Sequence, residues 1–348
     1  MFFNALRERI DSYFSENKID PTGNFQLYSK AIIFISVLIF CYVYLVFFTP
    51  GSILLSALLC AILGFDLAAI GFNVMHDGSH GSYSNNKWVN KMMAYTLNMM
   101  GGNAFLWNQK HNLTHHSYTN IEGIDDDIDI RPWIRCHEDQ PRKWFHKFQH
   151  IYCLPLYGMT HFFWVYIKDF KKYFTGKVAP GMTLRKMDLQ EHLIFWISKI
   201  FYFSVFIIIP MFKIGLIETI AGYMVVVLVS GFFLATVFQL AHVVEGAHFV
   251  APPTDDGPVK IESEWAVHQV STTANFATKS RITNWFLGGL NFQIEHHLFP
   301  RISHIHYPKI SKIVRETCRE FNLNYLENPT VFLAMKSHLL YLKRIGVA

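Results

Sequence analysis

Residues 52–80 read SILLSALLCAILGFDLAAIGFNVMHDGSH, an apolar run that leads directly into a pair of histidines. Residues 52–72 come close to the roughly 20 residues that an α-helix needs to cross the hydrocarbon of a bilayer. His76 and His80 are four positions apart, so both imidazoles would point to the same side of a helix. This stretch therefore predicts a membrane-spanning helix that presents imidazoles where it leaves the lipid.

Three further segments have the length and hydropathy of a membrane span, namely residues 31–48, 193–212 and 219–240. Their short connections, at 49–51 and 213–218, leave no room for a domain, so the four spans should form two hairpins. A composition with 51% hydrophobic and 16% aromatic residues supports this interpretation. Because no Pro/Ser-rich linker or internal repeat divides the chain, we expect an all-α integral membrane protein with one membrane-embedded unit over residues 1–348.

Positively charged residues predict the orientation, because lysine and arginine concentrate in short loops on the cytosolic side. They occur in the N-terminal arm at Arg7, Arg9, Lys18 and Lys30 and in the tail at Lys309, Lys312, Arg315, Arg319, Lys343 and Arg344, whereas the two hairpin turns contain only Lys213. Both termini should therefore be cytosolic. Residues 73–192 and 241–348 would then form a cytosolic cap, with the interrupted apolar segments Met92–Trp107 and Ile151–Ile167 along the membrane interface.

Charge and cysteine content argue against several other classes of protein. The formal charge of +5 is small and the basic residues are spread along the chain, so we expect no nucleic-acid partner and instead a lipid bilayer. The five cysteines show no CxxC spacing, which argues against a disulfide framework and a thiolate metal site. Residues 1–30 are polar and mixed in charge, so the first span, rather than a cleaved signal peptide, should target the protein to the membrane.

Histidines occur in three clusters: His76 and His80 in HDGSH, His111, His115 and His116 in HNLTHH, and His296 and His297 in QIEHH. Neutral imidazole suits iron, copper, zinc and nickel, and eight or nine such ligands exceed what one four-coordinate zinc uses. Soluble di-iron bundles use paired Glu-x-x-His motifs, and here only Glu245 and His248 have that spacing. The clusters therefore predict a pair of redox-active metal ions that are held by histidine beside the membrane.

HDGSH at 76–80, HNLTHHSYTN at 111–120 and QIEHHLFP at 293–300, in this order around hairpin spans, resemble the three histidine boxes of the membrane fatty acid desaturases. The resemblance runs from about Asn73 to the C-terminal region. Gln293, where most relatives in this superfamily have histidine, is similar to the front-end acyl desaturases, which insert a double bond between an existing one and the carboxyl end. The resemblance implies a bundle of four transmembrane helices whose helical cytosolic cap carries a di-iron site.

The resemblance also implies the metal ligands. By position in the three boxes they are His76, His80, His111, His115, His116, His296 and His297, with Gln293 at the weaker ligand position. The family tends to supply another ligand from the end of the fourth span, where His242 is best placed and Gln239, Glu245 and His248 compete with it. Gln293 leaves two arrangements open, because its amide oxygen or a water molecule can bind the iron.

A chain that resembles these desaturases is expected to use two iron ions and dioxygen, its co-substrate, to remove two hydrogens from neighbouring methylenes of a fatty acyl chain. That substrate would be linked to coenzyme A, a carrier protein or a lipid. Trp107, four residues before His111, is expected to wall the acyl tunnel. Because the chain contains no His-Pro-Gly-Gly heme motif, a separate ferredoxin or cytochrome b5-like electron donor is implied. The bacterial inner membrane is favoured, or the endoplasmic reticulum if the protein is eukaryotic.

Two other functions stay open from the sequence. A hydroxylase or ketolase of the same superfamily would share the metal ligands and transfer oxygen to the carbon. A histidine-lined metal transporter belongs to a different class and would need ionisable residues through its spans, which contain Asp66 and little else. We interpret Asp66 as a structural polar contact.

The remaining polar features have simpler interpretations. We expect His137, His146, His150, His161, His192, His304, His306 and His338 to be surface or interfacial residues, and His268 to have a somewhat greater chance of a role. The acidic run 125–129 is interpreted as a solvated loop, with contact to metal-bound imidazoles as the alternative. The basic residues Lys168, Lys171, Lys172, Lys177, Arg185 and Lys186 suit either coenzyme A phosphates or anionic headgroups. The amphipathic segment Tyr307–Phe321 should pack on the cap.

Overall fold

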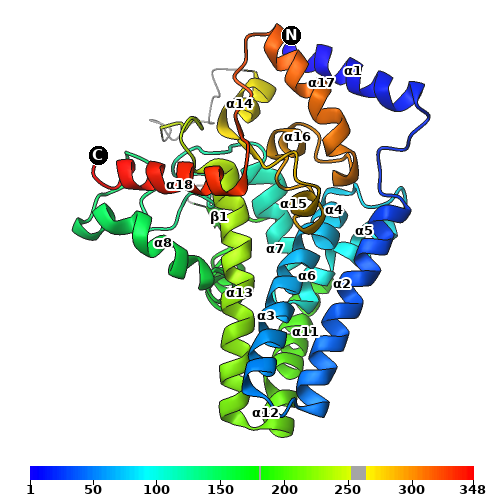
Figure 1. Ribbon diagram of the computed structural model, residues 1–348, viewed down its shortest axis with the longest axis vertical. Coiled ribbons are helices and arrows are strands. Elements are labelled where there is room, and N and C mark those ends of the chain that lie inside the picture. Colours follow the sequence, from blue (N-terminus) through cyan, green and yellow to red (C-terminus); the bar gives the residue numbers. More distant parts are fainter. Residues whose placement is uncertain (180–181, 252–263) are drawn as a thin grey trace.

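The computed structural model describes residues 1–179, 182–251 and 264–348, and it is almost entirely helical (Figure 1). Four helical units have the length and hydropathy of membrane spans: Phe25–Phe48, Ile53–His80, Leu189–Ile214 and Leu216–His242. Long helices form the narrow lower part of the molecule, and the other helices and both termini lie in the wider upper part (Figure 1). The predicted all-α membrane fold with four spans is confirmed. Residues 180–181 and 252–263 of the predicted cap lie outside the described residues.

The four spans are built from α2 (Phe25–Val43) with η1 (Tyr44–Phe48), α3 (Ile53–Ile70) with η2 (Gly71–Met75) and α4 (His76–His80), α11 (Leu189–Phe203) with η6 (Ser204–Ile208) and α12 (Ile209–Ile214), and α13 (Leu216–His242). The other elements are α1 (Phe2–Glu16), α5 (Lys87–Ala94), α6 (Thr96–Met99), α7 (Ala104–Asn108), η3 (Gln109–His115), η4 (Trp144–Phe148), α8 (Gln149–Gly158), α9 (Thr160–Phe163), η5 (Trp164–Lys168), α10 (Asp169–Thr175), α14 (Trp265–Thr272), α15 (Arg281–Phe286), α16 (Gln293–Leu298), η7 (His304–His306), α17 (Tyr307–Glu320) and α18 (Val331–Ile345). Strands β1 (Lys177–Ala179) and β2 (Met182–Thr183) pair antiparallel, and β3 (Asn275–Phe276) and β4 (Glu327–Asn328) pair parallel.

Small residues bring the spanning helices close together. A Cβ on Gly64 of α3 would lie 2.5 Å from the carbonyl oxygen of Val226 in α13, so only glycine fits at this crossing. Gly231 of α13 is held equally tightly against the backbone of Gly158 at the end of α8. Close backbone approach at small residues is typical of helix pairs in membranes, where dispersion contacts replace the hydrophobic effect.

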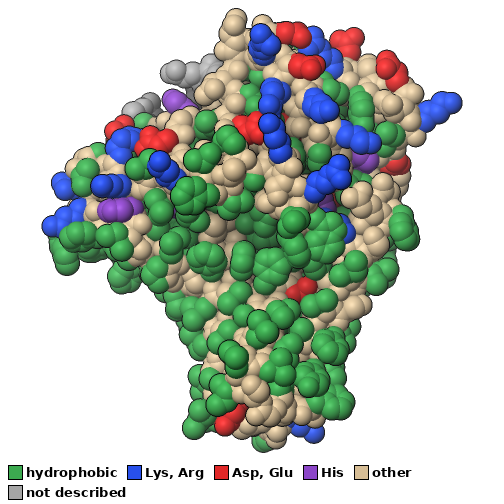
Figure 2. All heavy atoms as spheres, viewed as in Figure 1, with side chains coloured by type: hydrophobic (Ala, Val, Ile, Leu, Met, Phe, Trp, Pro, Cys, Tyr) green, Lys and Arg blue, Asp and Glu red, His purple; other side chains and the backbone are tan. Residues whose placement is uncertain are grey.

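The outer surface of the spans is apolar. Ile33 and Phe40 on α2 and Ile197 and Ile200 on α11 are all exposed, and hydrophobic side chains cover most of the narrow part in Figure 2. Lysine and arginine gather on the wider part above it. An apolar belt of this kind is costly in water and stable against lipid hydrocarbon.

Helix α17 packs on the upper part of the molecule, as its amphipathic pattern predicts. Ile310, Val314 and Cys318 are buried in one apolar cluster with Leu6 and Ile10 of α1. At the edge of this contact, Arg9 donates two hydrogen bonds to the carboxylate of Glu320, at 2.9 and 2.7 Å. The N-terminal helix is thereby joined to α17 above the spans.

Candidate metal centre

Eight imidazoles from distant segments of the chain meet in one buried cluster. They come from α4 (His76, His80), η3 and the residue after it (His111, His115, His116), the end of α13 (His242) and α16 (His296, His297). Their ring nitrogens form overlapping groups in which the atoms lie within 4.8 Å of one another: His76, His80, His111 and His296; His115, His242 and His297; and His116, His296 and His297. The overlap means that the groups are neighbours rather than separate sites.

Two continuous helices carry the histidines of the first cluster and of the fourth span. The second span runs without a break from α3 through η2 into α4, so His76 and His80 lie on the last turns of a helix that begins at Ile53. The fourth span ends on His242 itself. Both spans therefore extend beyond the predicted ends at residues 72 and 240, because the polar residues that follow continue the helical backbone.

The second histidine cluster is π-helical rather than α-helical. The N–H of His116 donates to the carbonyl oxygen of His111 at 3.1 Å, an i to i+5 hydrogen bond. This wider turn brings His111 and His116 to the same side, with their Nε2 atoms 3.2 Å apart. An α-helix would align only His111 and His115, so the π-helical turn adds a third imidazole to the cluster. Single π-helical turns are frequent at functional sites.

The outer nitrogens of several rings are held by hydrogen bonds. The Nδ1 atom of His115 lies 3.0 Å from the Asp125 carboxylate, and that of His297 lies 2.7 Å from Oε1 of Gln269. The Nδ1 atom of His242 lies 3.4 Å from the Thr272 carbonyl oxygen, and that of His296 lies 3.2 Å from the Tyr307 hydroxyl. Such partners fix the tautomer and the direction of a ligating imidazole.

Most of the Nε2 nitrogens, which face the inside of the cluster, have no hydrogen-bond partner among the described residues. Buried Nε2 atoms without a hydrogen-bond partner among the described residues belong to His76, His80, His115, His242, His296 and His297. An unpaired buried polar atom costs about 1–3 kcal/mol, so a cluster of them would be strongly unfavourable without a common binding partner. Inward lone pairs and outward hydrogen bonds together are the donor arrangement of a metal site.

Burial favours the uncharged form of these imidazoles. It lowers the pKa values of His111, His116, His296 and His297 well below the ordinary 6.5, and the neighbouring imidazoles lower them further. Neutral imidazole is the form that binds metal. For His115 burial acts in the same direction, but Asp125 and Asp127 outweigh it and raise the pKa. His115 is therefore the imidazole with the strongest carboxylate support.

The acidic run 125–129 lies against the cluster instead of in solvent, so the interpretation as a solvated loop was wrong for its first three residues. Asp125 is buried against His115, and Asp127 lies 3.4 Å from the same ring and pairs with Lys110. Asp126 lies 3.2 Å from Lys172 and 3.6 Å from Lys168. Lysines thus neutralise the carboxylates that approach the imidazoles, which explains why this charged run is tolerated so close to the membrane.

A cavity of about 360 Å³ reaches the cluster at His111. Trp107 forms part of its wall, and the Trp107 ring stacks on the His111 imidazole with centroids 4.2 Å apart. The apolar lining comes from α8, α9, η5 and α13 and includes Leu156, Phe163, Trp164, Ile167, Leu234 and Phe238. Charged residues also line it, namely Lys110, Asp126, Asp127, Asp129, Arg131, Lys168, Asp169, Lys171 and Lys172. Such a cavity suits an elongated ligand with a polar end.

The sequence profile that matches this chain, over residues 50–329, is described as fatty acid desaturase. The chain belongs to the fatty acid desaturase family. It is 38% identical to an acyl-lipid (8-3)-desaturase of Physcomitrium patens, over 99% of this chain and 72% of that protein. Two proteins named sn-1 linoleoyl-lipid 6-desaturase are 36% identical (Arthrospira platensis, 99% of this chain and 93% of that protein) and 35% identical (Synechocystis sp., 100% and 96%). The desaturase is a membrane oxidoreductase that acts on acyl lipids.

The structure places the predicted site residues of the desaturase as follows. His76, His80, His111, His115, His116, His242, His296 and His297 are together in the cluster, and Trp107 lies between the cavity and His111. Gln293 is buried at the start of α16, and its Nε2 atom has no partner among the described residues. The three competitors of His242 lie elsewhere: Gln239 lines the cavity, Glu245 pairs with Arg344 at 3.1 Å, and His248 is exposed.

Several histidines outside the boxes were wrongly expected at the surface. The desaturase buries His137, His146, His161, His304, His306 and His338, whereas His150 is half-buried and His192 is exposed. Their rings bridge buried polar groups that would otherwise be unpaired. His338, for example, lies 2.6 Å from the Tyr157 hydroxyl and 2.5 Å from the Val243 carbonyl oxygen. His268 is also buried, 2.9 Å from the Thr119 carbonyl oxygen and outside the metal cluster.

Two other expectations need correction. Asp66 is buried in α3, but its Oδ2 atom has no hydrogen-bond partner among the described residues, so the expected polar contact is not found. Of the basic residues at 168–186, Lys168 and Lys172 pair with Asp126, and Arg185 pairs with Glu191. Part of this stretch therefore neutralises the desaturase's own carboxylates.

Sequence reasoning missed Gln269, Thr272 and Tyr307, which hold the outer nitrogens of three imidazoles. Gln269 and Thr272 lie on α14 and Tyr307 begins α17, far along the chain from most of the rings that they orient. Polar residues on short helices carry no spacing signal, so only the folded structure connects them with the metal centre.

Proposed function

We propose that this desaturase uses two iron ions and dioxygen to introduce a cis double bond into a fatty acyl chain. The observation that carries the proposal is the set of inward, unpaired Nε2 atoms in a buried cluster whose outer nitrogens are hydrogen-bonded. His76, His80, His111 and His296 would hold one ion, and His115, His242 and His297 the other. His116 lies between the two groups, and Gln293 occupies the predicted weaker ligand position.

Two electrons and two protons must be supplied from outside. Removal of two hydrogens from the acyl chain provides two electrons and two protons, whereas reduction of one dioxygen to two waters takes four of each. The iron pair supplies the dioxygen chemistry when it is bound. Among the described residues, the groups of His, Cys, Asp and Glu that could hold a metal all belong to the histidine cluster and its acidic neighbour Asp127, and we propose a separate ferredoxin or cytochrome b5-like donor.

The residues of the cavity position the acyl chain and exclude water. A methylene offers no charge for recognition, so the apolar walls from α8, α9, η5 and α13 must fix which carbon lies at the cluster. Trp107 is the wall residue that stacks on His111, and we propose that it sets the depth of the chain relative to that ring. The lysines among the cavity residues suit a polar or anionic end of the substrate.

We further propose a front-end reaction on an acyl chain that is esterified to a membrane lipid. The support is the similarity to proteins that are named acyl-lipid (8-3)-desaturase and sn-1 linoleoyl-lipid 6-desaturase. Gln293 in the third box is the residue that agrees with this subgroup. The positive termini argue for a cytosolic position of the wide part and its histidine cluster.

Expression in a host that is fed linoleic acid tests the proposal directly. We expect a new double bond on the carboxyl side of the existing ones, located by mass spectrometry of the lipid classes, and close to two irons per purified chain. An oxygenated product without an alkene would instead indicate a hydroxylase. Stoichiometric zinc without iron in freshly prepared protein would contradict the metal assignment.

A further inference from the structure

A chain of aromatic side chains connects the metal cluster with the surface of the wide part. The indole Nε1 of Trp265, at the start of α14, donates to the carbonyl oxygen of His116 at 3.0 Å. Its ring meets Phe3 of α1 edge to face, with centroids 5.4 Å apart. Phe3 in turn stacks on Phe299, with centroids 5.8 Å apart. Phe299 follows His297 by two residues, so the outer rings of this chain, Phe3 and Phe299, are also close in sequence to a proposed ligand.

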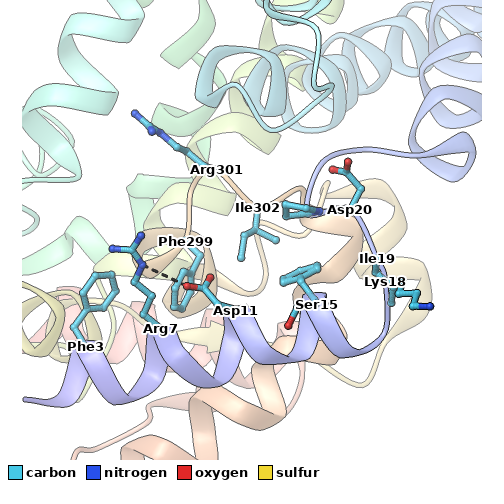
Figure 3. Close-up of a pocket in the computed structure, with 12 residues that line it drawn as sticks. Phe3, Arg7, Asp11, Ser15, Lys18, Ile19, Asp20, Phe299, Arg301 and Ile302 are labelled. Atoms are coloured by element: carbon cyan, nitrogen blue, oxygen red, sulfur yellow. Dashed lines mark ion pairs between the residues drawn. The ribbon is translucent and has the colours of Figure 1, made fainter.

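The outer end of the aromatic chain opens into a groove (Figure 3). Phe3 and Phe299 line it together with Phe14, Ile19 and Ile302, and its volume is about 740 Å³. One wall is α1 and the other is the segment 299–302, which follows the third histidine box. The groove therefore has apolar lining residues, one of which, Phe299, is only two residues from His297.

The charged residues of the groove are unbalanced in favour of positive charge. Asp11 pairs with Arg7 at 3.6 Å, and Asp20 accepts hydrogen bonds from the backbone and hydroxyl of Thr22. Lys18 and Arg301 are exposed at opposite ends of the groove, and neither has an acidic partner among the described residues (Figure 3). Helix α17, which packs on α1 but is not part of the groove lining, carries Lys309, Lys312, Arg315 and Arg319 on its exposed side against Glu316 and Glu320. An acidic protein surface would complement this rim.

We propose that the groove between α1 and residues 299–302 is the docking site of an acidic one-electron carrier protein, and that Trp265 connects the docked carrier electronically with His116. The proposal rests on the proposed function, which requires two electrons from outside. Two reduced carriers dock in turn for each double bond, and each leaves oxidised after it has given up one electron. The solvent supplies the two protons. Together with the two hydrogens from the acyl chain, the two electrons and two protons reduce one dioxygen to two waters.

Charge reversal at both ends of the groove tests the docking site. We compare the double variant K18E/R301E with K336E/K343E, a matched charge reversal at exposed positions of α18. The probes are a plant-type [2Fe–2S] ferredoxin and a soluble cytochrome b5 domain, and the carrier-driven rate of each protein is divided by its own rate with dithionite. For the carrier that reduces the wild type, K18E/R301E should raise KM about tenfold and weaken its salt dependence, whereas the control should stay near wild type.

Equal KM values in K18E/R301E and the wild type, or an equal increase in the control variant, would overturn the docking site, as would failure of both carriers to reduce iron in the wild type. These outcomes differ from failure of the proposed function. In that case the iron-loaded wild type would form no double bond with dithionite as the reductant, whatever the carriers do.

Trp265→Phe tests the electronic connection separately. Phenylalanine keeps the packing against Phe3 but cannot donate to the His116 carbonyl oxygen. We expect unchanged iron content and carrier affinity and a severalfold slower reoxidation of the docked carrier in stopped-flow experiments. An unchanged reoxidation rate, or a loss of iron that accounts for the whole effect, would assign Trp265 a structural role only.

Discussion

The two halves of the histidine cluster are held in different ways. His115, His242 and His297 each have an outer nitrogen within hydrogen-bond distance of a buried polar group, at Asp125, Thr272 and Gln269. In the first group, His296 has such a partner in the Tyr307 hydroxyl, at 3.2 Å, whereas for His76, His80 and His111 the described residues include none. Their rings pack instead on one another and on Trp107: the His76 and His80 centroids are 4.7 Å apart, and the Trp107 and His80 centroids are 6.0 Å apart.

The cavity reaches the centre at His111, a ring of the first group, with Trp107 beside it. Asp126 and Asp127 of the acidic run also line the cavity, and Asp127 lies 3.4 Å from His115 of the second group. Under the proposed function, the ring that borders the acyl chain directly therefore belongs to the first group, which is positioned mainly by helical backbone and ring packing. The second group lies toward α14 and the acidic run, where directional hydrogen bonds fix each ring. We therefore expect substitutions of non-ligand residues near the second ion to lower the affinity for that ion, and substitutions near the first ion to change the position of the substrate.

The largest effect is expected when a ligand of either half is removed. His111→Ala and His297→Ala should each abolish double-bond formation and lower the iron content from two ions to one or none, because in the proposed reaction both ions would act together on dioxygen. Metal analysis and lipid product analysis measure the two effects. His248→Ala, an exposed histidine outside the cluster, is the control and should behave as wild type. Full iron content in both ligand variants would refute the assignment.

The next largest effect should come from Asp125→Asn. This change keeps the shape but removes the negative charge that supports His115, and loss of such a partner lowers metal affinity or activity about 10- to 100-fold. Iron titration should show one weakened ion and one unchanged ion, since no ring of the first group contacts Asp125 in the described structure. Asp139→Asn, at an exposed carboxylate, is the matched control. An equal loss of affinity for both ions would show that the two halves of the cluster are not held independently.

A smaller effect on rate is expected for Trp107→Leu, with the product as the main readout. Loss of the ring that stacks on His111 enlarges the cavity, so the acyl chain should bind less accurately and the rate should fall about tenfold. New double-bond positions should appear in the product while iron content stays normal. Trp88→Leu, at an exposed tryptophan of α5, controls for the loss of an indole. A product that is unchanged in position and rate would exclude Trp107 from substrate positioning.

The mildest perturbation is pH, which acts on the metal-free protein. Burial holds the pKa values of His111, His116, His296 and His297 below the ordinary 6.5. As the pH falls below 6.5, these histidines take up protons in the unfolded chain but not in the folded chain, so the free energy of unfolding decreases. The thermal midpoint of iron-free protein should fall between pH 7.5 and 5.5. A midpoint that rises over this range would show that the rings are charged in the fold.

Much of the fold and of the ligand set can be predicted from the sequence. Long apolar runs specify the spans, and the spacing of His76 and His80 or of His111 and His115 predicts shared helix faces. The π-helical turn that adds His116 cannot be predicted in this way, because no pattern of residue types distinguishes a π-helical turn from an α-helical one. Buried histidines such as His338 and His304 were also missed, since hydrophobic patterning does not show which polar residues find partners inside.

Two ligand-bearing helices pass from lipid to metal with no loop in between: one from Ile53 to His80, the other from Leu216 to His242. A helix accommodates a thicker or thinner hydrocarbon layer by tilting. Any such tilt moves His76, His80 and His242 together with the lipid-facing residues below them. A change in bilayer thickness would thus be transmitted along these two helices to the histidines at their ends, and with them to the spacing of the two proposed ions.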